Sequence, residues 1–334
     1  MQGQVYKIHS DFYYVKNSNM DFECKLKETL KKQKENVFVG DFVELSDDDN
    51  FIVKIIERKN LLPRPKVANI DTALIVCSLK EPELDFIQLN RYLILLNYYK
   101  IPVCICFNKE DLEDNLASIQ KKVKGIYKNI NINIFFISAK EKTGVNKLIP
   151  HIKDKLIALC GQSGVGKSTL INTLCNINLK TGKVSEKTSR GTHTTRHIEI
   201  IEHKDFRIID TPGFSNLQFD FILPDKLIDY FPDIAKYKGG CKYSDCLHDT
   251  GKEGICSIVD NLNNIDITRY QSYLTYLEEC KIYKKEISNK SIKEEQFKKQ
   301  TGTRITTKIS KQKRLSARNT AKQRIKKYDS NELL

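Results

Sequence analysis

The stretch Gly161-Gln-Ser-Gly-Val-Gly-Lys-Ser168 decides the fold of this 334-residue chain. It matches the pattern G-x-x-x-x-G-K-[S/T] in full, and an apolar run, Leu156–Cys160, comes directly before it. Its glycines let backbone N–H groups close around phosphate oxygens, and a helical stretch, Thr169–Cys175, follows with its positive N-terminal dipole. The context disfavours a plain glycine-rich turn and predicts a nucleoside triphosphate site in an α/β domain. The candidate nucleotide-binding residues are Gly161, Gln162, Ser163, Gly164, Val165, Gly166, Lys167, Ser168 and Thr169.

Two residues of this loop are candidates for chemistry. Lys167 would bridge the β- and γ-phosphates, which makes it a candidate catalytic residue, and Ser168 would ligate Mg²⁺. The loop therefore predicts Mg²⁺ bound together with the nucleotide.

A second motif predicts that the base is guanine. Asn108-Lys-Glu-Asp111 follows the apolar run Val103–Phe107. The Asp111 carboxylate can accept hydrogen bonds from N1–H and the exocyclic amine of guanine, whereas adenine would leave it unpaired. Ser138-Ala-Lys140 follows another strand candidate and has the form of a second guanine loop, with a backbone N–H for the base oxygen. The guanine-site candidates are Asn108, Lys109, Glu110, Asp111, Ser138, Ala139 and Lys140.

Two further segments have the character of switch elements. Asp210-Thr-Pro-Gly213 can hold a Mg²⁺ water through Asp210 and sense a γ-phosphate through the Gly213 N–H. Arg190–Thr195 is polar and contains Thr194, a candidate Mg²⁺ ligand. Phe214 stands near the place where related enzymes carry a water-orienting Gln, so slow intrinsic hydrolysis is expected. His193 is the nearest polar candidate to orient the water, and a packing role for His193 remains equally open.

The order of these motifs predicts a circular permutation. The guanine loops precede the phosphate loop, and the switch elements come last, ending at Gly213. Strand candidates Thr72–Cys77, Val103–Phe107, 132–137, Leu156–Cys160 and Phe206–Ile209 alternate with helical stretches, which favours a largely parallel sheet. The second switch then leads directly into the C-terminal region, and could transmit loss of the γ-phosphate to it.

The N-terminal region predicts a small β-barrel. Five short strand candidates occupy Val5–His9, Phe12–Val15, Asp21–Leu26, Asp41–Leu45 and Phe51–Ile56. This density of short strands is typical of an OB-fold. Pro63 and Pro65 mark a boundary near Arg64. The expected fold is therefore multidomain: an OB-fold over 1–66, a circularly permuted α/β P-loop GTPase domain over 67–222, a mainly helical zinc-binding domain over 223–285, and a basic tail over 286–334.

The third domain is predicted from a cluster of metal-ligand residues. Cys241, Cys246, His248 and Cys256 form a Cys₃His set within 16 residues, which is the ligand set of a closed structural zinc site. The alternative is four reduced side chains in a loop, but so short a loop needs a metal to fold. One structural Zn²⁺ per chain is expected. Cys77, Cys104, Cys106 and Cys160 lie in apolar runs and are interpreted as buried hydrophobic residues.

Charge and composition indicate the kind of partner and the cellular compartment. The net charge is +14, and residues 281–334 contain 17 Lys and Arg against five Asp and Glu. Such a block is either a solvated end or an arm that contacts phosphates. The sequence contains no long apolar run and no signal-peptide pattern, so we expect a cytoplasmic protein without a membrane partner. Ten Cys without an export signal agree with a reducing compartment.

Taken in order, the motifs resemble one known family. The chain looks like the RsgA (YjeQ) ribosome-biogenesis GTPases in six motifs. They are Asn-Lys-Glu-Asp-Leu (108–112), Ser-Ala-Lys, the phosphate loop, Gly-Thr-His-Thr-Thr-Arg-His (191–197), Asp-Thr-Pro-Gly-Phe and Gly-Gly-Cys-Lys-Tyr-Ser-Asp-Cys-Leu-His (239–248). Arg58–Pro65 and Val67–Asp71 resemble that family's join between barrel and GTPase domain.

The resemblance implies a function. It implies GTP hydrolysis to GDP and phosphate, stimulated by the small (30S) ribosomal subunit, with binding to 16S rRNA, late subunit maturation and release on hydrolysis. It also implies that His193 assists hydrolysis, and we expect a monomer. The alternative is a constitutive RNA-binding protein in which guanine nucleotide is only structural. A signalling GTPase at a membrane is a weaker alternative, because the tail lacks an apolar helical face and a terminal Cys.

Overall fold

The chain divides into two compact units. A computed structural model describes residues 1–17, 20–33, 35–46, 49–177, 198–210, 219, 221–249, 254–295, 298–301 and 304–307, with side chains through residue 288. One unit contains Met1–Gln218 and Asp225–Thr275, and the other contains Phe219–Pro224 and Tyr276–Leu334. Within these described ranges, no helix combines the length and the apolar character needed to cross a membrane.

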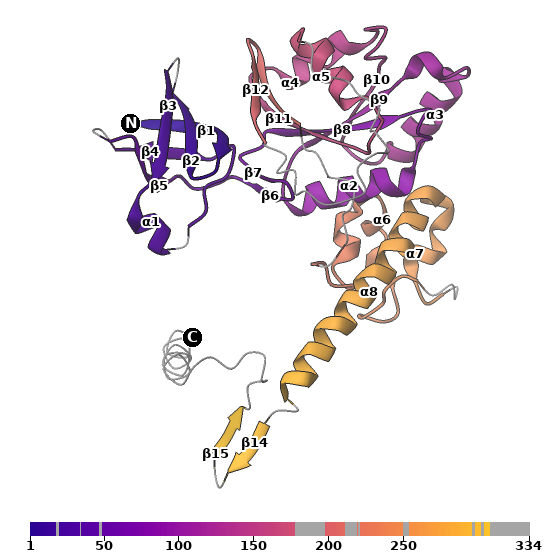
Figure 1. The fold of residues 1–334 in the computed structure, drawn as a ribbon. Helices are drawn as coiled ribbons and strands as arrows, with labels where there is room; N and C mark the ends of the chain where they lie inside the picture. Colours follow the sequence, from indigo (N-terminus) through magenta and orange to yellow (C-terminus); the bar gives the residue numbers. More distant parts are fainter. Residues whose placement is uncertain are drawn as a thin grey trace, which may run out of the picture. The chain divides into compact units, whose positions relative to one another are not determined.

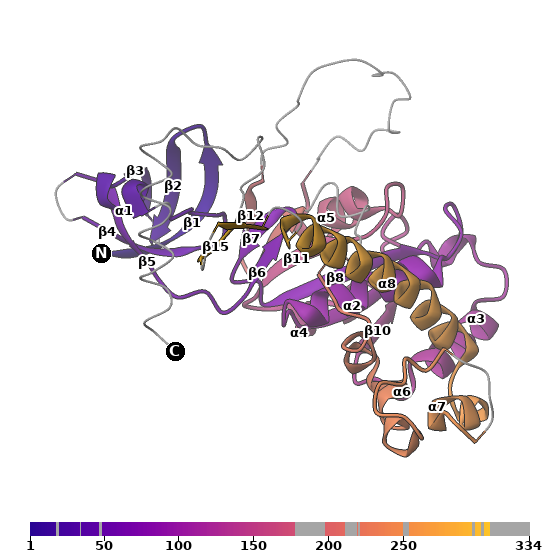
Figure 2. The same cartoon turned by 90° about the horizontal axis from the view of Figure 1, so that it is seen from below.

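The first five strands close into a barrel (Figures 1 and 2). The strands are β1 (Gln2–His9), β2 (Phe12–Asn17), β3 (Met20–Leu26), β4 (Phe42–Leu45) and β5 (Phe51–Ile55), paired in the order β1-β2-β3-β5-β4 with β4 returning to β1. The β3–β5 pair is parallel and the other pairs are antiparallel. Alternating residues such as Val5, Val15 and Val43 fill the interior. The predicted OB-type barrel is confirmed.

One helix and one pair of strands near the barrel were not predicted. The helix α1 (Glu28–Gln33) lies between β3 and β4 and buries only Leu30, so its sequence carries no helical periodicity. The antiparallel pair β6 (Leu61–Pro63) and β7 (Lys66–Ala68) occupies the region where the sequence indicated only a boundary. Each strand of this pair is three residues long, too short for an alternating pattern to be recognised.

A six-stranded sheet follows the barrel. Its order is β10-β9-β8-β11-β13-β12, formed by β8 (Thr72–Ser78), β9 (Val103–Asn108), β10 (Asn133–Phe136), β11 (Leu156–Cys160), β12 (Ile200–His203) and β13 (Phe206–Asp210). Every pair is parallel except β12–β13. The five predicted strands are present, and the antiparallel edge strand β12 was missed. Helices α2 (Phe86–Tyr98) and α3 (Leu116–Tyr127) lie on one face, and α4 (Ile149–Ile152) and α5 (Lys167–Cys175) lie on the other (Figure 1).

The strand order explains the unusual order of the motifs. The chain starts in the middle of the sheet at β8, runs outward through β9 to β10, and returns to β11 beside β8. From β11 it continues toward the opposite edge. The point where the direction reverses, between β8 and β11, is where parallel α/β sheets bind ligands at the carboxyl ends of their strands. The phosphate loop follows β11, as the permuted order predicts.

The C-terminal part of the first unit is mainly helical, as predicted. It contains α6 (Pro232–Ala235), α7 (Ser257–Asp260), the 3₁₀ turns Leu227–Tyr230, Lys238–Gly240 and Leu262–Asn264, and the start of α8 (Ile267–Glu295). Two further 3₁₀ turns, Glu110–Leu112 and Val145–Lys147, lie in the GTPase domain. Phe231 and Tyr273 are fully buried and pack edge to face, with ring centroids 5.4 Å apart.

The second unit contains the predicted basic tail. Within it, Phe219 packs on Tyr276 with ring centroids 4.7 Å apart. The helix α8 continues to Glu295, beyond the predicted end of the helical domain at residue 285. A hairpin of β14 (Lys298–Thr301) and β15 (Arg304–Thr307) follows. Residues 308–334 lie outside the described part of the chain.

Candidate nucleotide site and candidate metal centre

Asn108, at the end of β9, joins the three predicted nucleotide loops. Its side chain is 2% exposed. The Nδ2 amide donates to the Val165 carbonyl at 2.8 Å, and the Oδ1 atom accepts from the Ala139 N–H at 2.9 Å. One amide therefore connects the phosphate loop, the guanine loop and the Ser138 loop, although these are far apart in sequence.

Two phosphate-loop glycines are required by close packing. Gly166 has φ +95°, and a Cβ there would lie 2.3 Å from Asn108 Nδ2. Gly161 has φ +142°, and a Cβ there would lie 2.2 Å from the Val76 carbonyl oxygen. Both positions exclude any larger residue, because the left-handed backbone and the neighbouring atoms oppose it together.

The Lys167 ammonium lies against its own loop. Its Nζ donates to the carbonyls of Gly161 at 2.9 Å and Gln162 at 2.7 Å. Burial lowers the pKa of Lys167 from its usual value, while the nearby Asp210 carboxylate, at the end of β13, acts in the opposite direction. Ser168 and Thr169 are half-buried in the first turn of α5. The phosphate loop, Lys167 and the carboxyl end of β13 therefore lie near one another.

The predicted guanine loop leaves one carboxylate open to solvent. Asp111 is exposed, whereas Glu110 is held by the Thr143 hydroxyl, which donates to Glu110 Oε1 at 2.7 Å. Lys109 adopts φ +63° and donates through Nζ to the Glu81 carbonyl. Ser138 is buried and accepts from the Glu141 N–H at 3.1 Å. Ala139 is buried, and its N–H already has an acceptor in Asn108.

Lys140, the last residue of the Ser138 loop, is exposed and pairs with Glu141 at 3.2 Å. Four predicted features lie outside the described residues. They are His193, Thr194, Gly213 and the residue after it, Phe214.

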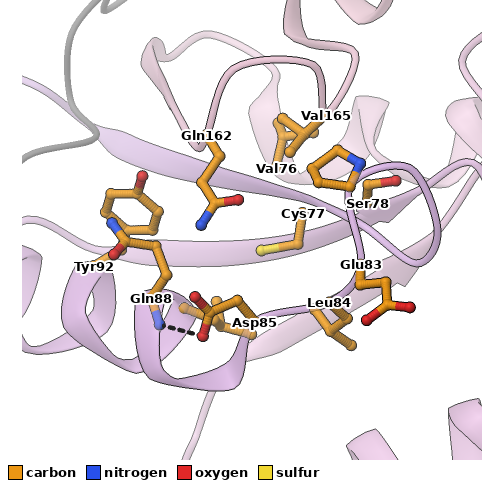
Figure 3. Close-up of a pocket in the computed structure, with 12 residues that line it drawn as sticks. Val76, Cys77, Ser78, Glu83, Leu84, Asp85, Gln88, Tyr92, Gln162 and Val165 are labelled. Atoms are coloured by element: carbon orange, nitrogen blue, oxygen red, sulfur yellow. Dashed lines mark hydrogen bonds between the residues drawn. The ribbon is translucent and has the colours of Figure 1, made fainter.

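A small pocket adjoins the phosphate loop (Figure 3). It lies between Gln162 and Val165 of that loop, Cys77 at the end of β8, and the start of α2. Its volume of about 10 Å³ suits one water molecule. Asp85 caps α2 by accepting from the Gln88 N–H at 3.0 Å, a role that an Asp before an apolar helical run could have indicated. Burial raises the pKa of Cys77 to about 12, so this thiol stays neutral, in agreement with its predicted packing role.

The four predicted metal ligands come together. The ligand atoms of Cys241, Cys246, His248 and Cys256 all lie within 4.8 Å of one another. His248 Nδ1 is 3.5 Å from the sulfurs of Cys241 and of Cys256, and those two sulfurs are 4.0 Å apart. Tetrahedral zinc, with its usual bond lengths, needs sulfur–nitrogen separations of about 3.6 Å and sulfur–sulfur separations of about 3.8 Å. The donor set and its spacing therefore fit a metal ion.

Tyrosines of α8 fix the backbone of this loop. The Tyr270 hydroxyl donates to the His248 carbonyl at 2.8 Å, and the Tyr273 hydroxyl donates to the Leu247 carbonyl at 2.7 Å. Burial lowers the pKa of His248, which favours the neutral imidazole that a metal requires. These tyrosines were not predicted, because their partners are more than 20 residues away.

Comparisons with known proteins agree with this geometry. The model of the RsgA N-terminal domain matches residues 2–51, and the model of the RsgA GTPase matches residues 55–220. A relative from Clostridium acetobutylicum, named small ribosomal subunit biogenesis GTPase RsgA, is 40% identical over 287 residues, covering 84% of this chain and 98% of the relative. The chain belongs to the RsgA family of GTPases. It is accordingly a GTP-hydrolysing enzyme.

Other RsgA relatives and solved structures show the same extent of similarity. RsgA 2 of Oceanobacillus iheyensis is 38% identical over 85% of this chain and 98% of its own length. The crystal structure of YjeQ from Thermotoga maritima has a TM-score of 0.71 at 28% identity, covering 84% of this chain and 98% of that one. YloQ, a circularly permuted GTPase, has a TM-score of 0.69 at 31% identity, covering 84% and 94%.

A third family model, described as a 50S ribosome-binding GTPase, matches residues 156–291. This match begins at β11, so it does not include the barrel or the guanine loops that precede the phosphate loop. The RsgA models and relatives account for both, and they cover more of the chain.

Proposed function

We propose that this RsgA-family GTPase binds the small ribosomal subunit, assists its late maturation, and leaves it after GTP hydrolysis. The observation that carries this proposal is the junction at Asn108, where guanine and phosphate loops meet in permuted order. The relatives that this chain matches over 98% of their own length are named for small-subunit biogenesis. The proposed place of action is the cytoplasm, where subunits are assembled, and the proposed RNA partner is 16S rRNA, bound by a monomer.

In the proposed site, Asp111 recognises guanine and the phosphate loop holds the triphosphate. Lys167 would turn from its loop carbonyls to the β- and γ-phosphates. Ser168, with Asp210 through water, would hold Mg²⁺, which neutralises charge that develops on the phosphates. Thr194 as a Mg²⁺ ligand, the Gly213 N–H as a γ-phosphate sensor and His193 as an aid to the attacking water complete the proposed set.

For the metal centre we propose one Zn²⁺, held by Cys241, Cys246, His248 and Cys256. Three thiolates and one imidazole fill a tetrahedral coordination shell, so the ion would be structural. We also propose the four-part division predicted from the sequence, with domains at 1–66, 67–222 and 223–285 and a basic tail at 286–334.

Phosphate release tests the proposed function. Purified small subunits should raise the rate of GTP hydrolysis, and large subunits at equal concentration serve as the control. The second candidate function is a constitutive RNA-binding protein, which Phe214 favours because it cannot orient water. In that case, RNA binding would persist unchanged in GTP and GDP, and neither subunit would raise the hydrolysis rate.

A further inference from the structure

The barrel and the β12–β13 hairpin enclose a second, larger cleft in the first unit. It measures about 370 Å³, within the range of small-ligand sites. We call it the barrel–hairpin cleft. The lining residues used in the argument are Gln4 and Tyr6 of β1, Lys16 of β2, Phe42 of β4, Glu202 of β12 and Arg207 of β13. None of them belongs to the predicted nucleotide or metal sites.

Two aromatic side chains contribute to the wall of the cleft. Phe42 is 41% exposed at the start of β4, on a barrel surface where polar residues usually face solvent. Tyr6 is half-buried, with its ring centroid 6.3 Å from that of Tyr14. Aromatic faces beside a groove are the sequence-tolerant means by which proteins stack single-stranded bases.

Arg207 supplies an unneutralised cation. Its Nη1 donates to the Gln4 side-chain oxygen, and within the described part of the chain no carboxylate lies at ion-pair distance from its guanidinium. The neighbouring Glu202 is instead paired with Lys16. Guanidinium has five N–H donors in a planar fork that suits phosphate oxygens, so most of its donors remain available.

Gln4 fixes the direction of that cation. The Gln4 side chain is buried at 7% exposure, and its Nε2 donates to the Gly40 carbonyl at 3.0 Å. Its Oε1 atom therefore points to Arg207 and not away from it. A buried amide that orients a half-buried guanidinium resembles a prepared anion contact more than a chance surface pair.

We propose that the barrel–hairpin cleft binds a nucleotide of single-stranded RNA, with the base against Phe42 and Tyr6 and a phosphate on Arg207. The inference rests on the proposed function, and it names a site for part of the RNA contact. Arg207 lies on the same strand as Asp210, three residues before it. RNA in the cleft therefore contacts the strand that ends in the nucleotide site, which links RNA binding to GTP hydrolysis.

Fluorescence anisotropy with a labelled oligouridylate tests the cleft, using the full chain. Phe42→Ser should weaken binding about five- to tenfold without changing the salt dependence, because it removes stacking only. Arg207→Met should weaken binding and lower the slope of log affinity against log salt by about 0.7, the value for one lost phosphate contact on a single strand.

Each cleft variant has a matched control. Met20→Ser removes an exposed apolar side chain from the same barrel, and Lys204→Met removes an exposed cation from the β12–β13 turn. Neither residue lines the cleft, so both controls should bind as the unmodified chain does. Thermal unfolding verifies that all four variants are folded.

In the binding measurement, two results would overturn the inference: cleft variants that bind oligouridylate as tightly as their controls, or an unmodified chain that does not bind it. The proposed function is measured separately, by small-subunit stimulation of hydrolysis. If small subunits still stimulate GTP hydrolysis fully in Phe42→Ser and Arg207→Met, the cleft proposal is overturned and the proposed function stands. Oligouridylate binding that depends on the cleft, without any small-subunit binding, supports the cleft and overturns the proposed function.

Discussion

At the residue scale, Asn108 and Asp111 have different roles in the guanine loop. Asn108 is buried and holds the loops together, whereas Asp111 is exposed. Both residues could be identified as guanine-site candidates from the sequence, because the motif is local. It could not show that Asn108 bonds Val165, since that contact joins residues 57 positions apart.

The exposed carboxylate should determine base specificity. Asp111→Asn replaces an acceptor of two guanine hydrogen bonds by an amide that suits the oxygen-bearing xanthine ring. We expect the preference to move from GTP toward xanthosine triphosphate, measured by competition against a fluorescent nucleotide. The control Asp114→Asn removes an exposed carboxylate nearby and should keep the preference for GTP. ATP competing with the unmodified chain as well as GTP does would refute the assignment.

The packing of Gly166 makes a second prediction at this scale. Gly166→Ala places a Cβ 2.3 Å from Asn108 Nδ2 at φ +95°, so it should displace the amide that joins the loops. We expect GTP affinity to fall at least about tenfold, a loss of about 1.4 kcal/mol. Gly125→Ala is the control: it lies in α3 with nothing within 4 Å of the new Cβ, and should stabilise the helix by about 0.5–1 kcal/mol. Equal GTP affinity in the two variants would contradict this account.

At the element scale, the metal loop and the helices around it are held by different forces. The loop has short elements and tyrosine contacts to its backbone, and we propose that a metal ion supplies the remaining stabilisation. The helices share a buried polar network centred on Arg269, which is 1% exposed. The Cys₃His spacing was readable from sequence because all four ligands lie within one short segment. The burial of Arg269 could not be predicted from the sequence, because its partners lie 36 and 179 residues away.

Removing one metal ligand should affect the helical domain that contains the loop and leave the nucleotide site intact. Cys246→Ala should abolish zinc binding, measured by elemental analysis, and lower the helical domain's protection in hydrogen exchange. Nucleotide affinity should stay near that of the unmodified chain. Cys280→Ala, a buried thiol outside the cluster, is the control and should keep its zinc. An unmodified chain purified without chelator and free of zinc would disprove the metal assignment.

The metal site should also be sensitive to acid. Burial lowers the pKa of His248 in the folded chain below its ordinary value of 6.5. The stability that depends on neutral imidazole is therefore complete above that ordinary value and is lost as pH falls below it. Thiolate ligands take up protons in the same direction. Zinc release, followed with a chelating dye, should increase as pH is lowered from neutral, and release that is independent of pH would contradict this.

Arg269 makes a separate stability prediction. It forms a two-pronged ion pair with Asp233, at 2.8 and 2.9 Å, and donates to Asn90 at 2.7 Å. Arg269→Met should lower the free energy of unfolding by about 3–5 kcal/mol, because it leaves a buried carboxylate unpaired. Adding Asp233→Leu should restore much of the loss. The control Lys80→Met breaks an exposed ion pair and should leave stability almost unchanged in denaturant titrations.

At the scale of the whole molecule, charge is concentrated at one end of the chain. Residues 281–334 carry 17 Lys and Arg against five Asp and Glu. Barrel, permuted sheet and helical domain were all predictable, because alternating strands and strand–loop motifs repeat over many residues. The elements α1, β12 and the β6–β7 pair were not, since each is short and depends on partners elsewhere in the chain.

The charged end predicts salt-dependent RNA binding. If six to ten basic side chains contact phosphates, affinity should fall by roughly 10³–10⁵ between about 50 and 200 mM salt. Deleting the residues after Lys290 should weaken binding to small subunits and flatten the salt slope, while nucleotide binding persists. Unchanged affinity and slope in the shortened chain would show that this end is only solvated.

Cosedimentation of the full chain with purified 30S subunits tests the central claim most directly. The chain should be compared with a non-hydrolysable GTP analogue and with GDP, at one fixed salt concentration. The account predicts that the chain pellets with the subunit in the GTP-analogue state and remains largely in the supernatant in the GDP state. Equal pelleting in the two states, or none in either, would contradict it.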